Sequence, residues 1–361
     1  MSAIDLSIDP LKPSADWFNV LFETVGISAK VERLTAKAIG TGQIGENVRF
    51  EFTYAGEAGD APSSLVGKFP STNEASLATA KLLGHYQREV LFYREFAAIA
   101  ARIAPAPLYA EHDKETNRFV LVMQDMAPAQ QGDQLSGCSV DDAERAMEAA
   151  AILHTAHWND ARLDKHDWLQ GTENAPPPPI TPEMSQELWV GFKQRYADRL
   201  DAEDVEVGDT FCDALPKWSE GYEGPMALVH NDYRLDNMLF GDAGAAKPLA
   251  VVDWQTVGKG APAIDVAYFI GAGLTRDARP DHERHLLAHY HKCLTREGVT
   301  SYSLDDLYRD YCWFSFYGMS VAFGAAMLVE QTERGDEMFL TMLRRHAAQA
   351  RDNNALALLV K

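Results

Sequence analysis

Between Leu228 and Phe240 the chain reads Leu-Val-His-Asn-Asp-Tyr-Arg-Leu-Asp-Asn-Met-Leu-Phe, and from Leu249 to Trp254 it reads Leu-Ala-Val-Val-Asp-Trp. A polar loop thus lies between two short apolar runs, and a further apolar run ends on an acid. Short apolar runs of this kind are typical of buried strands. The pattern therefore predicts polar side chains that are held in place by a small hairpin and by the end of a neighbouring strand.

Three oxygen-bearing side chains in this stretch suit the transfer of a phosphoryl group. That reaction asks a protein mainly to position a hydroxyl group and to neutralise charge on phosphate oxygens. Asp232 could accept a hydrogen bond from the attacking hydroxyl, while Asn237 and Asp253 could supply oxygen ligands to a metal ion. Because none of these ligands is a thiol, and zinc usually recruits histidine or cysteine, we expect the metal to be magnesium.

The spacing of these residues resembles that of the aminoglycoside phosphotransferases and choline-kinase-like small-molecule kinases, which are relatives of the protein kinases. Protein kinases carry H-R-D, then N after four residues, and their metal-binding acid lies in D-F-G. This chain has His230-Asn-Asp232, Asn237 at the same offset, and Asp253-Trp-Gln255. It departs from the small-molecule branch at Asn231, where that branch more often has glycine.

The resemblance implies an α+β, two-lobed protein-kinase-like fold. Its small N-lobe would be an antiparallel sheet with a helix, and its larger C-lobe would be mainly helical. We place the boundary after Met126, so that residues 1–126 bind the nucleotide phosphates and residues 127–361 carry the catalytic loop, the metal and the acceptor. The resemblance further implies ATP and Mg²⁺ as cofactors, Asp232 as the catalytic base, and Asp265 as an acid that braces the catalytic loop.

A glycine-rich stretch near the amino terminus is the candidate phosphate-binding loop. It reads Ile39-Gly-Thr-Gly-Gln-Ile-Gly45 and precedes an alternating run, Val48–Tyr54, that predicts a strand. Gly40, Gly42 and Gly45 would let the backbone approach phosphate oxygens closely. An ordinary hairpin turn has the same composition, so the interpretation depends on the downstream motif.

Lys68 lies near the end of a predicted strand, Leu65–Phe69, and the resemblance assigns it to the α- and β-phosphates of the nucleotide. A helix is predicted from Tyr86 to Phe96 by its apolar spacing. Glu89 precedes Phe92-Tyr93 as it does in the resembling family, and the resemblance implies that Glu89 pairs with Lys68. Glu95 is the alternative partner, although an exposed helix face is where most glutamates lie.

The run from Phe119 to Met126 predicts an apolar strand that turns polar at its end, and it resembles the hinge between the two lobes. The resemblance implies that backbone groups of Gln124 and Met126 bind adenine there. Substitution of either side chain is therefore expected to have little effect.

Length and composition agree with a two-domain enzyme of the cytoplasm. The chain has 361 residues, of which 46% are hydrophobic, and can bury a large core. Its first residues are acidic and lack the apolar run of a secretory leader. The uncharged stretch from Trp313 to Val329 is shorter than the ~20 residues of a membrane span and predicts a buried helix instead. Four scattered cysteines without a C-x-x-C motif indicate a reducing compartment.

The charge pattern bears on the partners of the protein. A net charge of −20 without a basic patch argues against nucleic acid. Acidic residues between Glu183 and Asp242 could attract a cationic acceptor such as an amino sugar or a choline-like amine, but a solvated surface has the same composition.

His154 and His157 could hold a metal on the helix predicted after Ser139. We favour a packing role for them, because no H-E-x-x-H pattern is present. The oligomeric state is left open.

The expected function is ATP-dependent transfer of a phosphoryl group to a hydroxyl of a small molecule. Protein acceptors are disfavoured, because the interval from Asp253 to Asp265 is too short for an activation segment and lacks A-P-E. The identity of the acceptor and the choice of ATP over GTP stay open. Two alternatives remain: a nucleotide-binding pseudokinase without turnover, and a metal-dependent hydrolase with Asp232, Asp236 and Asp253 as ligands. The hydrolase would not need Lys68 or the glycines.

Overall fold

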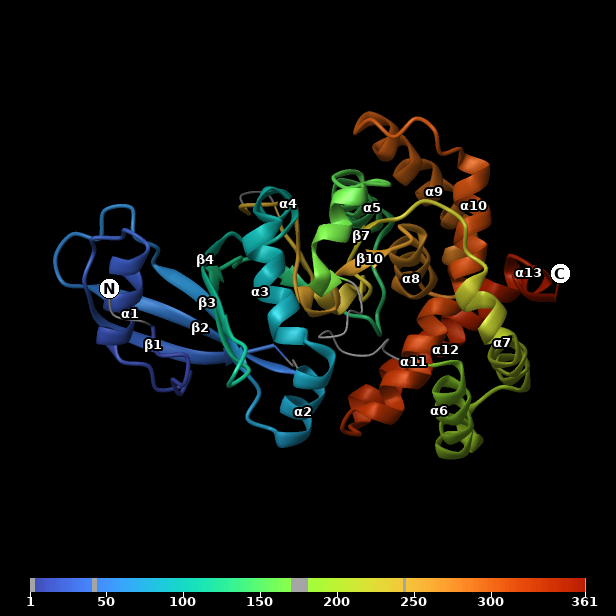
Figure 1. The fold of residues 1–361 in the computed structure, drawn as a ribbon, viewed down its shortest axis with the longest axis horizontal. Helices are drawn as coiled ribbons and strands as arrows, with labels where there is room; N and C mark the ends of the chain where they lie inside the picture. Colours follow the sequence, from blue (N-terminus) through green and yellow to red (C-terminus); the bar gives the residue numbers. More distant parts are fainter. Residues whose placement is uncertain (1–3, 41–43, 170–180, 243–244, 361) are drawn as a thin grey trace. The chain divides into compact units, whose positions relative to one another are not determined.

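The computed structural model describes residues 4–40, 44–169, 181–242 and 245–360, and the chain forms two compact units (Figure 1). The first unit contains residues 1–128 together with Asp253–Thr256, and the second contains residues 129–252 and 257–361. The predicted boundary after Met126 did not anticipate that Asp253–Thr256 belongs to the first unit.

The first unit is built on a five-stranded antiparallel sheet in the order β1-β2-β3-β5-β4. One helix precedes the sheet, and three helices lie between its third and fourth strands in the chain. In chain order the elements are α1 (Ala15–Thr24), β1 (Val31–Ile39), β2 (Gly45–Tyr54), β3 (Ser64–Pro70), α2 (Glu74–Leu83), α3 (His85–Glu95), α4 (Ala97–Ile103), β4 (Pro107–Asp113) and β5 (Arg118–Gln124).

Both faces of this sheet are covered by helices, which explains why its central strands are apolar on both sides. Phe18 of α1 packs against Phe50 and Phe52 of β2, with ring centroids 4.8 Å apart in each pair. On the opposite face Tyr86 of α3 stacks on Phe119 of β5, at a centroid distance of 4.4 Å. The sheet is therefore a central layer between α1 and α3.

Strand alternation decides the face on which Lys68 lies. Phe69 belongs to the core that includes Phe18 of α1. Successive side chains of a strand point to opposite faces, so Lys68 points to the face covered by α3. It stands opposite Leu121 of β5 in the register of the sheet. The same helix carries Glu89.

The second unit is mainly helical and contains two small antiparallel sheets, β7–β10 and β6–β8–β9. Its elements, besides short 3-10 turns, are β6 (Gln130–Gln131), α5 (Val140–Thr155), α6 (Pro182–Arg195), α7 (Ala202–Glu220), β7 (Ala227–Val229), β8 (Met238–Phe240), β9 (Leu249–Val251), β10 (Gly258–Gly260), α8 (Ala263–Gly273), α9 (Arg279–Arg296), α10 (Leu304–Trp313), α11 (Tyr317–Leu328), α12 (Glu333–Asp352) and α13 (Leu356–Val360). The predicted α+β organisation is confirmed.

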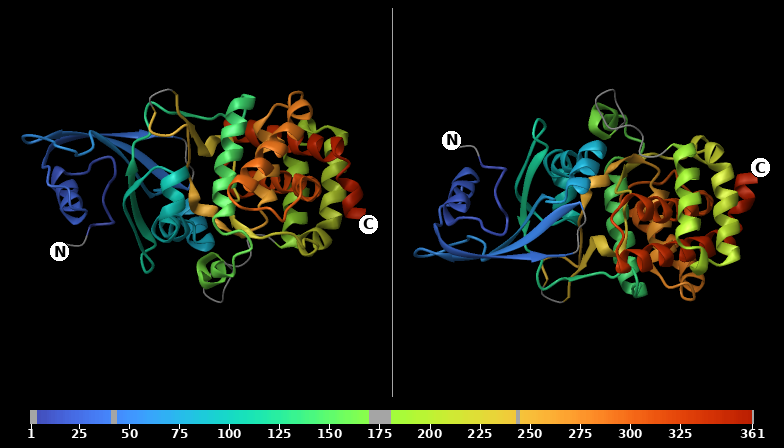
Figure 2. Two further views of the ribbon diagram at one scale, coloured as in Figure 1. Left: turned by 90° about the horizontal axis from the view of Figure 1, so that it is seen from above. Right: turned by 90° about the horizontal axis from the view of Figure 1, so that it is seen from below.

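Helix pairs give the second unit its core. Helix α9 packs along α5, and α12 packs along α11 (Figure 2). Helix α5 begins where the sequence predicts, because the Ser139 side chain accepts a hydrogen bond from the backbone N–H of Asp142 at 3.1 Å. The uncharged stretch after Trp313 forms a 3-10 turn, Phe314–Phe316, and then α11. Helix α5 also contacts β7 and β9, two of the short strands of the second unit.

One helical segment, Leu304–Leu328, is long and apolar enough to cross a membrane by length and composition alone. Within its apolar window 61% of the residues are buried inside the described structure. Helices in protein cores pass the same test of length and composition. The burial therefore favours a core role for this segment, as the sequence predicts for Trp313–Val329.

We predict that Phe18→Ala will lower the free energy of unfolding of the first unit by about 3–5 kcal/mol. Phe18 is fully buried, and its ring joins α1 to β2. Calorimetric unfolding of the whole chain would measure the loss. Leu11→Ala is the control, because Leu11 is 49% exposed and should change stability by less than about 0.5 kcal/mol. Equal effects of the two substitutions would contradict the packing described here.

Candidate active site

In the first unit Lys68 lies between two carboxylates. Its Nζ is 2.7 Å from Glu89 Oε2 and 2.7 Å from Asp253 Oδ1. The predicted pairing with Glu89 is confirmed, and the alternative partner, Glu95, is exposed. Burial by itself would lower the pKa of Lys68, but the charges of Asp253 and Glu89 outweigh burial and raise that pKa above its ordinary value. Lys68 therefore remains a cation at physiological pH.

Asp253 is anchored in the first unit by the residue that follows it. The Trp254 ring stacks on Phe92 of α3 with centroids 3.8 Å apart and an interplanar angle of 8°. The backbone N–H of Trp254 also donates a hydrogen bond to the Glu89 carboxylate. The Asp253 side chain is 27% exposed, whereas Lys68 and Glu89 are buried. Asp253 is thus the member of this group that a ligand can reach most easily.

The glycine-rich stretch ends beside Lys68. A β-carbon at Gly45 would lie 3.1 Å from the carbonyl oxygen of Phe69 and 3.3 Å from Lys68 Cε, so a larger residue would have to displace these neighbours slightly. Gly40 has φ +73°, a conformation that favours glycine. Gly42 lies outside the described residues. The Tyr86 hydroxyl donates to the Ile44 carbonyl at 2.6 Å and ties the end of the stretch to α3.

Gln124 is the last residue of β5 and Met126 lies two residues beyond it, and their roles as hinge residues and adenine contacts stay predictions. The backbone N–H of Gln124 donates to the carbonyl oxygen of Ala106 at 2.8 Å. Since that N–H is used within the sheet, an adenine contact at Gln124 would have to use its carbonyl oxygen. Met126 follows two residues later, and its side chain is buried.

In the second unit one buried carboxylate, that of Asp265 in the first turn of α8, holds the loop between β7 and β8. Its Oδ2 accepts the backbone N–H of His230 at 2.7 Å, and its Oδ1 accepts that of Asn231 at 2.9 Å. The bracing role that the resemblance implies for Asp265 is confirmed.

His154 lies between Asp265 and Tyr290. His154 Nε2 lies 3.1 Å from Asp265 Oδ2, and His154 Nδ1 lies 2.7 Å from the Tyr290 hydroxyl. These contacts give His154 the packing role favoured by the sequence.

The His230 ring ties the same loop to the end of β9. The backbone N–H of Asp232 donates to His230 Nδ1 at 3.2 Å, which places the ring hydrogen on Nε2. Nε2 then donates to the Val252 carbonyl oxygen at 3.0 Å. In return, the backbone N–H of Val252 donates to the Asn237 carbonyl oxygen at 2.9 Å. Both ends of the loop are therefore attached to the residue that precedes Asp253.

The backbone of Asn231 explains why this chain can depart from glycine at that position. Asn231 has φ +65°, in the left-handed region. Glycine enters this region without steric cost, and asparagine is among the residues that tolerate it best. The Tyr317 hydroxyl donates to the Asn231 carbonyl oxygen at 2.8 Å and supports the conformation.

Three donors hold the carboxylate of Asp232. Its Oδ1 accepts Arg234 Nε at 3.0 Å and the Tyr268 hydroxyl at 3.1 Å, and its Oδ2 accepts Asn237 Nδ2 at 2.8 Å. Asn237 Nδ2 donates a second hydrogen bond, to the Asp232 carbonyl oxygen at 2.9 Å. With the amide nitrogen bonded twice, the side-chain oxygen of Asn237 is the atom that suits a cation.

Arg234 and Tyr268 are the functional candidates that the sequence analysis missed. Arg234 also donates to Asp236 Oδ2 at 2.8 Å. Burial by itself would lower the pKa of Arg234, but nearby Asp232, Tyr268 and Asp236 raise it above its ordinary value. The sequence signal that could have identified Arg234 is its position two residues after the candidate base, Asp232.

The contacts of Asp236 bear on the hydrolase alternative. Asp236 Oδ1 accepts the backbone N–H of Gln134 at 2.9 Å. Because this carboxylate is used within the protein, the structure disfavours the hydrolase in which Asp236 is a metal ligand.

The acidic stretch between Glu183 and Asp242 is partly neutralised by internal ion pairs. Asp204 is buried and lies 2.7 Å from Arg351 Nη1. Asp209 pairs with Lys193 and accepts Trp189 Nε1 at 2.7 Å. These contacts favour a structural role for both acids over the attraction of a cationic acceptor.

The chain resembles known proteins over most of its length. A family model described as the ecdysteroid kinase-like family matches residues 45–299. No curated protein matches the sequence significantly. Among solved structures, the ethanolamine kinase of Plasmodium vivax is 11% identical, with a TM-score of 0.56 over 89% of this chain and 83% of that chain. A microcompartment-associated aminopropanol kinase is 12% identical, with a TM-score of 0.51 over 94% of this chain and 98% of that chain. The predicted protein-kinase-like fold is confirmed.

We predict that Asn231→Gly will be more stable than Asn231→Ala by about 1–2 kcal/mol. Both substitutions remove the side chain, but only alanine opposes the positive φ of this residue. The difference in unfolding free energy, measured in urea, therefore isolates the backbone term. Equal stability of the two variants would show that the left-handed conformation of Asn231 does not constrain the loop.

We predict that Arg234→Met will lower the free energy of unfolding by about 3 kcal/mol, because it removes the cation that contacts both Asp232 and Asp236 and leaves Asp236 with only the longer ion-pair contact to Arg334, at 3.5 Å. Arg234→Lys should recover part of the loss, since an ammonium cannot form the two-sided contact of a guanidinium. Arg162→Met is the control. Arg162 is 72% exposed and pairs with the neighbouring Asp160, so its loss should cost less than about 1 kcal/mol. If urea unfolding gave equal losses of unfolding free energy for Arg234→Met and Arg162→Met, the ion pairs of Arg234 would contribute no more to stability than an exposed pair.

Proposed function

The chain belongs to the ecdysteroid kinase-like family, and we propose that it transfers the γ-phosphoryl group of ATP to a hydroxyl group of a small molecule. One observation carries this proposal: the Asp232 carboxylate is held by Arg234, Tyr268 and Asn237 on a loop whose backbone is anchored to Asp265. A carboxylate that must orient an attacking hydroxyl needs such a fixed position.

Asp232 is the proposed base. Its Oδ1 accepts two hydrogen bonds and its Oδ2 accepts one, so one lone pair, on Oδ2, remains to accept the hydrogen bond of an acceptor hydroxyl. In a loose transition state, loss of the hydroxyl proton can follow cleavage of the bond to the leaving group. Asp232 therefore acts mainly by aligning the hydroxyl for in-line attack, and it receives the proton late in the reaction.

Lys68, Gly40, Gly42 and Gly45 are the proposed phosphate ligands. The Lys68 ammonium has three N–H donors, two of which face Glu89 and Asp253. A phosphate oxygen would take the third donor. Gly45 lies against Lys68 Cε, so backbone groups at this end of the glycine-rich stretch lie near the ammonium. Gln124 and Met126 complete the proposed nucleotide site through their backbone groups.

Asn237 and Asp253 are the proposed ligands of Mg²⁺, and their chemistry fits the ion. Both offer oxygen atoms, which magnesium prefers, and the hydrogen bonds of Asn237 Nδ2 leave its side-chain oxygen for the metal. When bound, the ion would offset negative charge on the phosphate oxygens. Lys68 holds Asp253 Oδ1 and thereby orients the carboxylate.

The proposed acceptor is a small hydroxylated molecule rather than a protein. Only β10 and a short turn separate Asp253–Thr256 from α8, which begins at Ala263. This interval has no room for the long activation segment of a protein kinase. We also propose a cytoplasmic location, because all four cysteines are free thiols and a reducing compartment keeps them so.

We predict that Asp232→Ala will lower turnover by about 10²–10⁴-fold while binding of Mg-ATP is retained. A library of hydroxylated metabolites, incubated with wild-type protein and ATP, would identify the acceptor by its gain of one phosphoryl group. The rate with that acceptor and the thermal shift with Mg-ATP would then be measured for each variant. Asp277→Ala, which removes an exposed acid, is the matched control and should behave as wild type.

The outcomes separate the proposal from its alternatives. Near-normal turnover of Asp232→Ala would exclude Asp232 as the base. Mg-ATP stabilisation of the wild-type protein without transfer to any acceptor would support the pseudokinase. Absence of stabilisation by Mg-ATP would contradict nucleotide binding altogether.

A further inference from the structure

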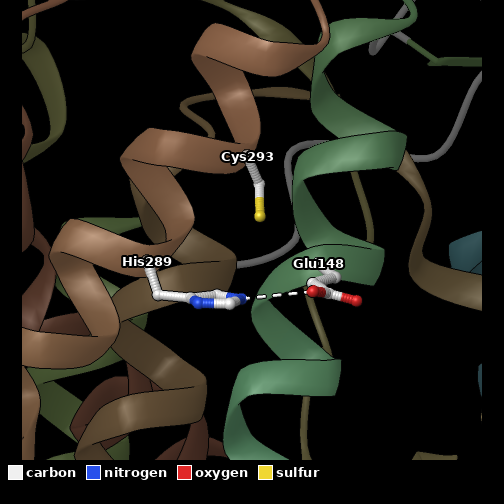
Figure 3. Close-up of side chains that lie close together, drawn as sticks. All are labelled: Glu148, His289 and Cys293. Carbon is white, nitrogen blue, oxygen red and sulfur yellow. Dashed lines mark ion pairs between the residues drawn. The ribbon is translucent and has the colours of Figure 1, made fainter.

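A cluster of metal-ligand side chains lies in the second unit, on the packed helices α5 and α9. Glu148 belongs to α5, and His289 and Cys293 belong to α9. One ligand atom of each residue, a carboxylate oxygen, an imidazole nitrogen and the thiol sulfur, lies within 4.8 Å of the other two. Figure 3 shows that His289 and Cys293 project from one helix toward the other, with the His289 ring directed at Glu148.

The contacts within this cluster leave the His289 ring poorly satisfied. His289 Nε2 lies 3.4 Å from Glu148 Oε1, which is longer than an ordinary N–H···O hydrogen bond of about 2.7–3.2 Å. Within the described part of the chain, this buried nitrogen makes no hydrogen bond. A buried polar atom without a hydrogen bond calls for an explanation, and a bound ion or water is a common one.

A second pair on the same two helices shows what a satisfied contact looks like. One turn earlier on each helix, His285 Nε2 makes a hydrogen bond with Glu144 Oε1. That pair has the same residue types but no cysteine beside it among the metal-ligand groups of the described residues. The long contact between Glu148 and His289 is therefore not a general property of this helix pair, and it occurs where a sulfur is also present.

We propose that Glu148, His289 and Cys293 bind a zinc ion that joins α5 to α9. Thiolate, imidazole and carboxylate are the three side-chain ligands of zinc, and the soft thiolate disfavours magnesium and calcium. His289 and Cys293 are four residues apart and share one helix face, which suits them to one ion. The Glu148 side chain is 46% exposed, so a water molecule can complete a tetrahedral set.

The geometry needs only a small adjustment. Ligand atoms at about 2.0–2.3 Å from a tetrahedral zinc ion lie roughly 3.5 Å from one another. The ligand atoms now lie within 4.8 Å of one another, so the longest of these distances must become about 1 Å shorter when zinc binds. The Glu148 side chain is 46% exposed and can move closer by changing rotamer. Cys293 is 2% exposed and supplies the fixed end of the site.

Zinc at this position would steady the support of the catalytic loop. The residue after His289 is Tyr290, whose hydroxyl contacts His154 of α5, and His154 in turn contacts Asp265. The relay from α9 through α5 to the loop thus begins beside the proposed ligands. The expected role of the ion is structural, and it does not depend on the identity of the acceptor or on turnover.

The test is metal binding by the purified full-length chain after removal of metal with a chelator. Excess Mg²⁺ is present throughout, so that oxygen-only sites do not take up the added metal. We expect one equivalent of Zn²⁺ to bind and to raise the unfolding temperature by several degrees. Co²⁺, used as a coloured substitute, should show the near-ultraviolet charge-transfer band of a cobalt–thiolate bond.

Variants assign the ligands. Cys293→Ser should abolish the cobalt–thiolate band, and His289→Gln should weaken Zn²⁺ binding at least about tenfold. Cys212→Ser removes another buried thiol, and His285→Gln breaks the matched pair. Both controls should keep the band and the affinity. Circular dichroism of the metal-free variants checks that each one folds, and Glu148→Gln, at an exposed position, serves if Cys293→Ser does not fold. The proposal is overturned if wild-type protein binds no stoichiometric zinc, or if binding survives in Cys293→Ser and His289→Gln.

Discussion

The buried carboxylate of Asp265 is the constraint on which the rest of the second unit depends. A charge without solvent is costly unless hydrogen bonds replace its water. Here the backbone N–H groups of His230 and Asn231, together with the His154 ring, take that place. Carboxylate and loop satisfy each other, so neither can move without leaving a buried polar group unpaired. These hydrogen bonds fix the loop backbone, and the loop backbone sets the position of Asp232.

Helix α8 serves the site twice, because its side chains repeat along one face. Asp265 braces the loop backbone, and Tyr268, three residues later, donates to the Asp232 carboxylate. Two positions near this chemistry also have positive φ values, Asn231 at +65° and Asp253 at +66°. Residues in this region persist only where their surroundings hold them, and such strain gathers at functional sites. Both are residue types that tolerate it, which limits the cost.

Much of this arrangement was open to prediction from the sequence, because the residues concerned lie in short local patterns. A polar loop between apolar runs predicted the position of Asp232 and Asn237, whereas the pairing of Lys68 with Glu89 followed from the resemblance to the small-molecule kinases. The resemblance also implied the antiparallel sheet and the mainly helical second unit. A period of two residues in strands and of 3.6 residues in helices decides which residues share a face. These faces can be predicted without knowing which distant segments of the chain they contact.

Contacts between segments far apart in the chain had to await the tertiary structure. The sequence marked Arg234 only as a cation near an acid, but folding made it the shared partner of Asp232 and Asp236. Asp253–Thr256 belong to the first unit, where Trp254 stacks on Phe92. No pattern in the neighbouring sequence indicates this. Amino-acid order determined the residue types, their spacing and the elements that carry them, because these depend on neighbours in the chain. Tertiary packing decided which side chains from distant segments meet. The free energy of those contacts comes from surface that two segments bury against each other, and such segments can lie far apart in the chain.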